Sequence, residues 1–181
     1  YNNTYGETGW KAITIRSLSI GQGEILTTPL QLANQAAAIA NKGYYIAPHL
    51  NKNDSMKSEK HICLVDSSHF DVVHRGMARV MTEGTGKWYN IPEWQICGKT
   101  GTVENPHGED HALFIGFAPM DNPKIAVAVA VENAGFDATW ACPIATLVME
   151  QYLSGEIKRN WLYKRMLEAN LIDKKNDGDK E

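Results

Sequence analysis

The spacing of apolar residues predicts three helices in the body of the chain. The first begins at Pro29, because Thr28 can cap the helix and Gln31, three residues later, completes a capping box. Its alanine-rich run ends at residues 41–43. We expect Gly43 to adopt the left-handed conformation that closes many helices.

Two more helices follow along the chain. Behind Ser68, apolar residues recur at helical spacing as far as the glycine-flanked Thr85, and these are Phe70, Val73, Met77, Val80 and Met81. Another helix covers about residues 140–153, with an apolar stripe formed by Ile144, Leu147, Val148 and Tyr152. Each stripe is expected to pack on a core.

Three strands are predicted between the second and third helices, at residues 95–103, 111–118 and 124–132. In the last strand, isoleucine and valine fall on one face and alanines on the other, so both faces should be buried. The linker 119–123 is short enough for an antiparallel hairpin. The fold class is therefore α+β, with a central antiparallel sheet and helices on both faces.

Composition excludes several classes of function. The 181 residues, 43% of them hydrophobic, suffice for one core. A net charge of -3 provides no attraction to nucleic acid or to an anionic membrane. The longest aliphatic run, residues 125–131, is far shorter than the roughly 20 residues of a membrane-spanning helix.

The ends of the chain differ from its body. Residues 156–181 contain 13 of the 39 charges, so we divide the chain into a body, 1–155, and a charged tail, 156–181. A short helix near residues 160–169 is expected to dock on the body. The chain begins with Tyr1 and has no apolar leader, which suggests processing or a longer parent.

The cysteines indicate neither a disulfide framework nor a zinc site. Cys63, Cys97 and Cys142 are odd in number, far apart and without a Cys-x-x-Cys spacing. Buried thiols are the expected state.

The candidate chemistry lies in residues 98–102, Gly-Lys-Thr-Gly-Thr, within the first strand of the sheet. Strand alternation places Thr100 and Thr102 on one face, as a hydroxyl pair suited to a carboxylate, and Lys99 on the other. Gly101 leaves room for a ligand or another backbone alongside. The alternative is an ordinary edge strand protected by a lysine.

Two other segments resemble binding sites by composition. Residues 107–111 contain two histidines and two acidic residues, but Pro106 and Gly108 favour a loop, so a solvated acidic turn is expected instead of a metal site. Residues 19–24 are glycine-rich, but no basic residue follows that could hold a phosphate. We expect neither a metal nor a cofactor.

The order of these segments resembles the transpeptidase domain of class B penicillin-binding proteins, in particular the elongation-type branch called penicillin-binding protein 2. The similar segments span about residues 9–153, and they are 17–24, 28–33, 43–48, 76–86, 98–102 and 111–133. The resemblance implies the fold shared by these transpeptidases and serine β-lactamases.

That family uses three motifs, Ser-x-x-Lys, Ser-x-Asn and Lys-Thr-Gly, and only the third occurs here. The chain therefore resembles the C-terminal half of a transpeptidase domain and should be inactive alone. The resemblance implies roles for four residues. Lys99 is a positive charge near the nucleophile, Thr100, Gly101 and Thr102 contact the substrate, and the Thr102 backbone N–H is an oxyanion donor.

The resemblance also implies what the parent protein does. It would cross-link peptidoglycan through a serine acyl-enzyme formed with a D-alanyl-D-alanine stem peptide, and β-lactam antibiotics would acylate it. Its partners would be the upstream half of the domain and a cell-elongation glycosyltransferase, at the periplasmic face of the bacterial inner membrane. The alternatives are a β-lactam sensor or serine β-lactamase relative, and a non-catalytic peptide-binding module.

Overall fold

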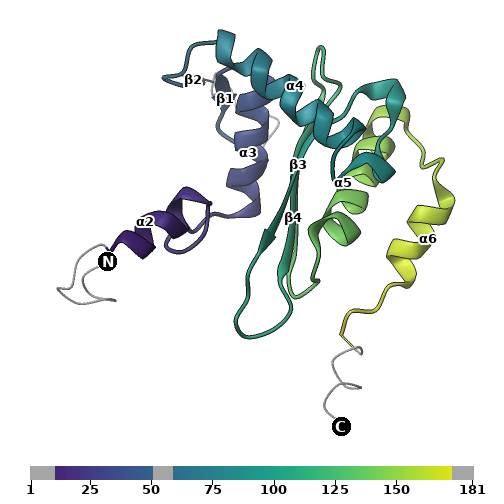
Figure 1. The fold of residues 1–181 in the computed structure, drawn as a ribbon. Coiled ribbons are helices and arrows are strands. Elements are labelled where there is room, and N and C mark those ends of the chain that lie inside the picture. Colours follow the sequence, from purple (N-terminus) through teal and green to yellow (C-terminus); the bar gives the residue numbers. More distant parts are fainter. Residues whose placement is uncertain (1–10, 51–58, 173–181) are drawn as a thin grey trace.

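The computed structural model describes residues 11–50 and 59–172 (Figure 1). Its elements, with short 3-10 helices written η, are α2 (Ala12–Ser19), α3 (Pro29–Ala40), β1 (Tyr44–Ile46), β2 (Lys60–Ile62), α4 (Ser68–Thr82), η2 (Lys87–Tyr89), η3 (Pro92–Trp94), β3 (Cys97–Val103), β4 (His111–Ala118), β5 (Ile125–Val131), α5 (Asp137–Ser154) and α6 (Asn160–Glu168). No helix in these two ranges is long and apolar enough to cross a membrane.

The predicted antiparallel sheet is present, with the strand order β3-β4-β5. Thr100 pairs with Phe114, and Ala118 pairs with Ile125 across the predicted hairpin. A separate two-stranded sheet of β1 and β2, which the sequence pattern did not predict, forms beside α3.

Helices cover both faces of the sheet, as expected, with α3 on one side and α5 on the other (Figure 1). The side chains of β5 that face α3 are smaller than those that face α5. Ala126 packs in a cluster with Ala40 of α3 and Phe117 of β4, whereas Val127 packs with Ala145 of α5. The small-residue face of β5 thus lets α3 approach closely.

The expectation that both faces of β5 are buried is wrong in part. Val127 is buried, but Ala130 is exposed and the other residues of the strand are half-buried. The reason is that β5 is an edge of the sheet, with no strand beyond it in the part of the chain that the structure describes.

Both ends of α3 show why it forms where it does. The capping box is present, because the Gln31 backbone N–H donates to Thr28 Oγ1 at 3.3 Å and the Thr28 N–H donates to Gln31 Oε1 at 2.8 Å. At the other end, Gly43 has a positive φ of 108°, as predicted, and Lys42 before it also has a positive φ, at 57°. The Gly43 N–H reaches the Ala38 carbonyl at 2.9 Å, which closes the last turn.

Helix α4 confirms the predicted segment but not every predicted core residue. Val73 is 41% exposed, and His74 is buried in its place. The His74 Nε2 atom lies 2.8 Å from the Ile39 carbonyl oxygen, so the imidazole links α4 to α3. At the start of α4, hydrogen bonds from the Ser68 hydroxyl and backbone N–H hold the pKa of Asp66 below its usual value.

The predicted apolar stripe of α5 is only partly buried. Leu147 is buried, but Val148 is 47% and Tyr152 is 63% exposed. The fully buried residues of α5 in the main core are Ala141, Cys142, Ala145 and Met149. Three of these four side chains are small, which allows the first half of α5 to approach the sheet closely.

The predicted short helix α6 docks on the body through Leu162, which is fully buried. A buried ion pair precedes it, in which Arg159 Nε donates to Glu150 Oε2 at 2.8 Å. Arg159 also donates to the Tyr89 backbone carbonyl at 2.9 Å. These contacts join the start of segment 156–181 to α5 and η2.

Candidate functional site

The candidate site lies on β3, which is the other edge strand of the sheet. Lys99 is exposed, and its ammonium donates to the Thr100 backbone carbonyl at 2.5 Å. A cation and the main chain of an edge strand are therefore accessible together. This is the geometry needed for an extended peptide that pairs with a strand and has a negative charge or a developing negative charge.

The two threonines of the segment differ in exposure, although they share a face. Thr102 is exposed, whereas Thr100 is only 4% exposed. Thr100 Oγ1 lies 2.8 Å from Thr85 Oγ1, in the loop that follows α4. The loop after α4 therefore covers Thr100, whereas Thr102 is open.

Sequence reasoning recognised Gly84-Thr85-Gly86 only as the end of a helix and assigned Thr85 no part in the site. The signal available was a hydroxyl between two glycines, 15 residues from Thr100. No local rule joins two such positions, so this neighbour could be found only in three dimensions.

Glycine is suited to positions 98 and 101 for different reasons. A Cβ atom at Gly98 would lie 2.3 Å from the ring of Phe114, which no side chain can accommodate without a shift. At Gly101 the nearest heavy atom to such a Cβ would be Leu113 Cβ, at an ordinary 3.7 Å. Packing therefore requires glycine at 98, whereas at 101 glycine keeps the strand surface clear.

This difference predicts effects of different size for two alanine substitutions. We expect Gly98→Ala to destabilise the chain by about 1–3 kcal/mol through overpacking against Phe114, and Gly101→Ala to change the free energy of unfolding by less than about 1 kcal/mol. Urea unfolding measures both. Equal destabilisation by the two substitutions would contradict this assignment.

The histidine-rich turn does not gather its groups for metal binding. Asp110 Oδ1 accepts from the Asn105 backbone N–H at 3.1 Å, and His111 Nδ1 accepts from the Asn133 N–H at 3.0 Å. Within residues 11–50 and 59–172, no three metal-binding side chains form a group. The first of these hydrogen bonds lies within the β3–β4 turn, and the second joins the start of β4 to the segment after β5.

The glycine-rich residues 19–24 follow α2, a helix that was not predicted. Gly21 and Gly23 both have positive φ, at 80° and 76°. None of the side chains of α2 is buried, and Ile13 and Ile15 are 61% and 60% exposed. The segment is an exposed turn beside an uncovered helix.

Cys97, next to the candidate segment, is not an activated nucleophile. Burial, and to a lesser degree the negative charge of Asp121, raise the pKa of its thiol to about 12. The Sγ atom lies 3.6 Å from the His74 carbonyl oxygen. A thiol with this pKa remains protonated near neutral pH, and the thiolate is the reactive form.

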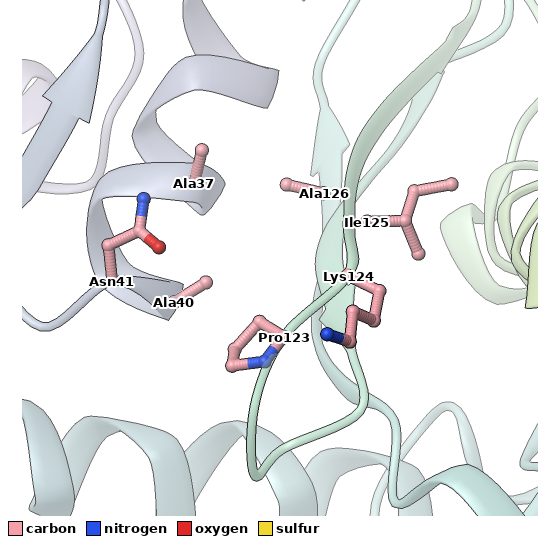
Figure 2. A pocket seen from close by; sticks show the side chains of 7 residues that line it. All are labelled: Ala37, Ala40, Asn41, Pro123, Lys124, Ile125 and Ala126. Atoms are coloured by element: carbon pink, nitrogen blue, oxygen red, sulfur yellow. The ribbon is translucent and has the colours of Figure 1, made fainter.

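Hollows also lie away from Lys99. A cleft of about 160 Å³ separates the end of α3 from the start of β5, where Asn41 and Lys124 stand at its rim (Figure 2). A larger groove of about 610 Å³ runs between α5 and α6 beside Ile125. Its lining is almost wholly apolar and includes Val148, Tyr152 and Leu167. We call it the α5–α6 groove.

Comparison with known proteins identifies the family of this chain. The sequence matches the family model described as "Penicillin binding protein transpeptidase domain" over residues 2–150. It is 32% identical over 163 residues to the peptidoglycan D,D-transpeptidase MrdA of Acinetobacter baumannii, a match that covers 76% of this chain. The match covers 24% of that relative, so the chain spans about a quarter of its length.

Solved structures have the same fold. The chain is similar to PBP2 from Pseudomonas aeruginosa in complex with WCK 5153, with a TM-score of 0.71 and 35% identity over 88% of this chain and 37% of that one. It is also similar to penicillin-binding protein A from M. tuberculosis, solved as an imipenem acyl-enzyme complex, with a TM-score of 0.66 and 36% identity over 76% of this chain and 33% of that one.

Proposed function

Because the chain belongs to the penicillin-binding protein transpeptidase domain family, we propose that it is part of a serine-type D,D-transpeptidase. The parent protein cross-links peptidoglycan stem peptides through a serine acyl-enzyme, and β-lactam antibiotics acylate the same serine. The observation that carries this proposal is the exposed Lys99 on an edge strand, within a Lys-Thr-Gly sequence. Residues 1–155 belong to the transpeptidase domain, and 156–181 form its charged tail.

Each proposed role follows from the position of the residue on β3. Lys99 stabilises negative charge at the reacting centre, because a fixed cation costs little reorganisation as charge develops. The backbone N–H of Thr102 donates to the oxyanion of the tetrahedral intermediate. Gly101 lets the stem peptide or the drug lie along the strand. The hydroxyls of Thr100 and Thr102 donate hydrogen bonds to the carboxylate of that ligand. No metal or cofactor takes part in these steps.

The nucleophile of this reaction comes from outside the 181 residues, since no serine among them has a lysine three positions later. The upstream half of the domain is therefore a required partner. Two features support this proposal: the uncovered helix α2, on which Ile13 and Ile15 are both exposed, and the α5–α6 groove beside the edge strand β5. Both would be covered by further parts of one domain.

The site of action follows from the substrate. Peptidoglycan cross-linking takes place outside the cytoplasm, so we place the parent at the periplasmic face of the inner membrane, with a cell-elongation glycosyltransferase as partner. A pull-down of the complete protein from solubilised membranes tests both the location and the partner. Recovery of the protein only from the cytoplasmic fraction would contradict the proposed location.

The test of the proposed function is intact-protein mass spectrometry with benzylpenicillin. The complete protein should gain the mass of one penicilloyl group, and peptide mapping should place it on a serine of a Ser-x-x-Lys motif. The 181-residue chain alone should gain none, because its serines lack the lysine that would deprotonate the nucleophile. A stoichiometric adduct on a serine of this chain would overturn the assignment.

A further expectation concerns the chain in isolation. The edge of β5, which has no neighbouring strand within residues 11–50 and 59–172 and lies beside an apolar groove, should pair with a second copy. Light scattering should therefore detect self-association, and Ala130→Lys should reduce it, because Ala130 is an exposed residue of that strand. Addition of the upstream half as a separate chain should also dissolve these assemblies. A chain that stays monomeric at high concentration would show that the β5 edge is protected.

A further inference from the structure

The segment after β5 bends back across the end of the sheet. Asn133 and Gly135 both have positive φ, at 53° and 76°, so the chain turns sharply after the strand. The Ala134 and Gly135 backbone N–H groups then donate to the Asp110 carbonyl oxygen at 2.9 and 2.8 Å. The segment therefore lies against the turn that joins β3 to β4, at the end of the sheet where β3 stops.

A side-chain hydrogen bond also fastens these two loops together. Asn105, two residues beyond β3, donates from Nδ2 to Asn133 Oδ1 at 2.8 Å. Backbone groups fix the orientation of the Asn105 amide. Its Oδ1 accepts the His107 N–H at 3.1 Å, and its Nδ2 also donates to the Glu109 carbonyl at 3.2 Å. The oxygen of Asn133 must therefore face Asn105.

The third attachment is a ring nitrogen. The Asn133 backbone N–H donates to His111 Nδ1 at 3.0 Å. A backbone N–H can only donate, so Nδ1 has no proton, and the proton of the neutral ring is on Nε2. This hydrogen bond exists only while His111 is uncharged, because both nitrogens of an imidazolium are donors. We call the contacts of residues 133–135 with residues 105–111 the loop clasp.

The surroundings of His111 offer no competing positive charge. His111 is half-buried at the start of β4, opposite Val103 of β3. The acidic residues of the strand ends and loops beside it are Glu104, Glu109, Asp110, Glu132 and Asp137. His107 is the other histidine there, and residues 104–111 and 132–137 contain no lysine or arginine. Histidine is the side chain that ordinarily gains its charge between pH 5 and 8.

The loop clasp lies next to the groups proposed for catalysis. Within the described residues only β4 pairs with the edge strand β3. Thr102, whose backbone N–H is the proposed oxyanion donor, pairs with Ala112, the neighbour of His111. Beyond Val103, the bond from Asn105 to the segment after β5 holds the chain in place. A donor that must meet developing charge at one position depends on such supports.

We propose that His111 is a positioning residue of the transpeptidase site, whose uncharged ring holds Asn133, and that protonation of this ring opens the loop clasp and slows acylation. This inference rests on the proposed function and adds a regulation by pH to the same site. In this role His111 touches neither the substrate nor the reacting serine, and it acts through the end of β3. The rate falls as the pH falls, because the charged ring cannot accept the Asn133 N–H.

The test measures acylation of the complete protein by benzylpenicillin between about pH 5 and pH 8, the range of histidine titration. His111→Asn keeps an acceptor, because the amide oxygen is bonded to Cγ as Nδ1 is, and it does not titrate. His111→Leu removes the acceptor. At the upper pH, His111→Leu should react about 2- to 10-fold more slowly than the wild type, the effect of one net hydrogen bond. His111→Asn should react at close to the wild-type rate.

As the pH falls, the wild type should lose rate relative to His111→Asn and approach His111→Leu. The ratio of two rates removes the titration of groups that all the proteins share. The matched control is His107→Asn, which replaces an exposed histidine of the same turn and should leave the rates unchanged at every pH. A readout besides activity is nitrogen NMR of histidine-labelled protein. The His111 signal, assigned by its loss in His111→Asn, should show a bare Nδ1 and a protonated Nε2.

The outcomes separate this inference from its premise. A wild-type protein that benzylpenicillin does not acylate contradicts the proposed function itself. If the wild type is acylated, a ratio of His111→Asn to wild type that stays constant with pH overturns the inference alone. So does a proton on Nδ1 at the upper pH, or a wild-type rate for His111→Leu there. If both variants lose rate and thermal stability together, the ring has only a packing role and the inference is also wrong.

Discussion

In the complete protein, Lys99→Ala is expected to slow acylation by benzylpenicillin about a hundredfold or more, the range over which preorganised charges and proton-transfer groups act. The fold should stay intact, because the side chain is exposed and its hydrogen bond is to the carbonyl of the next residue on the same strand. Stopped-flow acylation kinetics and thermal unfolding of the same samples measure the two effects separately.

A matched control is Lys124→Ala, which removes another exposed lysine beside the same sheet and should leave the acylation rate unchanged. Thr100→Val should slow acylation less than Lys99→Ala. If Lys99→Ala reacts at the parent rate and merely unfolds at a lower temperature, the lysine protects an edge strand and takes no part in the chemistry.

Glu150→Ala is expected to destabilise the chain by about 3–5 kcal/mol, the usual cost of removing one partner from a buried ion pair. The Glu150 side chain is 4% exposed and that of Arg159 is 18% exposed, so the guanidinium would lose its counter-charge away from water. Glu150 Oε1 also accepts the Lys158 N–H at 3.0 Å, so the start of the C-terminal segment would lose its attachment.

Urea unfolding with and without Glu150→Ala measures this loss. Both proteins are the 181-residue chain at low concentration, and both carry Ala130→Lys so that self-association through β5 does not add to the measured free energy. The control is Glu83→Ala, which breaks an exposed pair with Arg79 at the same 2.8 Å. Because water screens that pair, its removal should cost less than about 1 kcal/mol. Similar losses for the two substitutions would show that burial does not decide the strength of the Glu150–Arg159 pair.

Features that depend on a few neighbouring residues were predictable from the sequence. The Thr28 cap, Pro29 and Gln31 act within one helical turn, so they located the start of α3 correctly. The linker 119–123 is too short for anything but a hairpin, which determined the pairing of β4 with β5. Alternation of alanine and valine likewise predicted which face of β5 meets a helix closely.

Exposure could not be predicted with the same accuracy, because it depends on which distant segment covers a residue. The helical spacing predicted for α5 was correct, but it did not identify the buried side. Ala141 and Ala145 are buried, whereas Tyr152 of the predicted stripe is exposed. Likewise His74 is buried where Val73 was expected to be, because the imidazole lies 2.8 Å from the Ile39 carbonyl oxygen of α3.

For the candidate site, the sequence by itself determined the order Gly-Lys-Thr-Gly-Thr and its place on a strand, because alternation and glycine content are local properties. Tertiary structure alone decided that β3 is an edge, that Thr100 is buried and Thr102 is exposed, and that Thr85 lies 2.8 Å from Thr100. The physical reason is that strand periodicity acts between adjacent residues. The partner of a hydroxyl 15 positions away depends on how α4 ends and packs against the sheet.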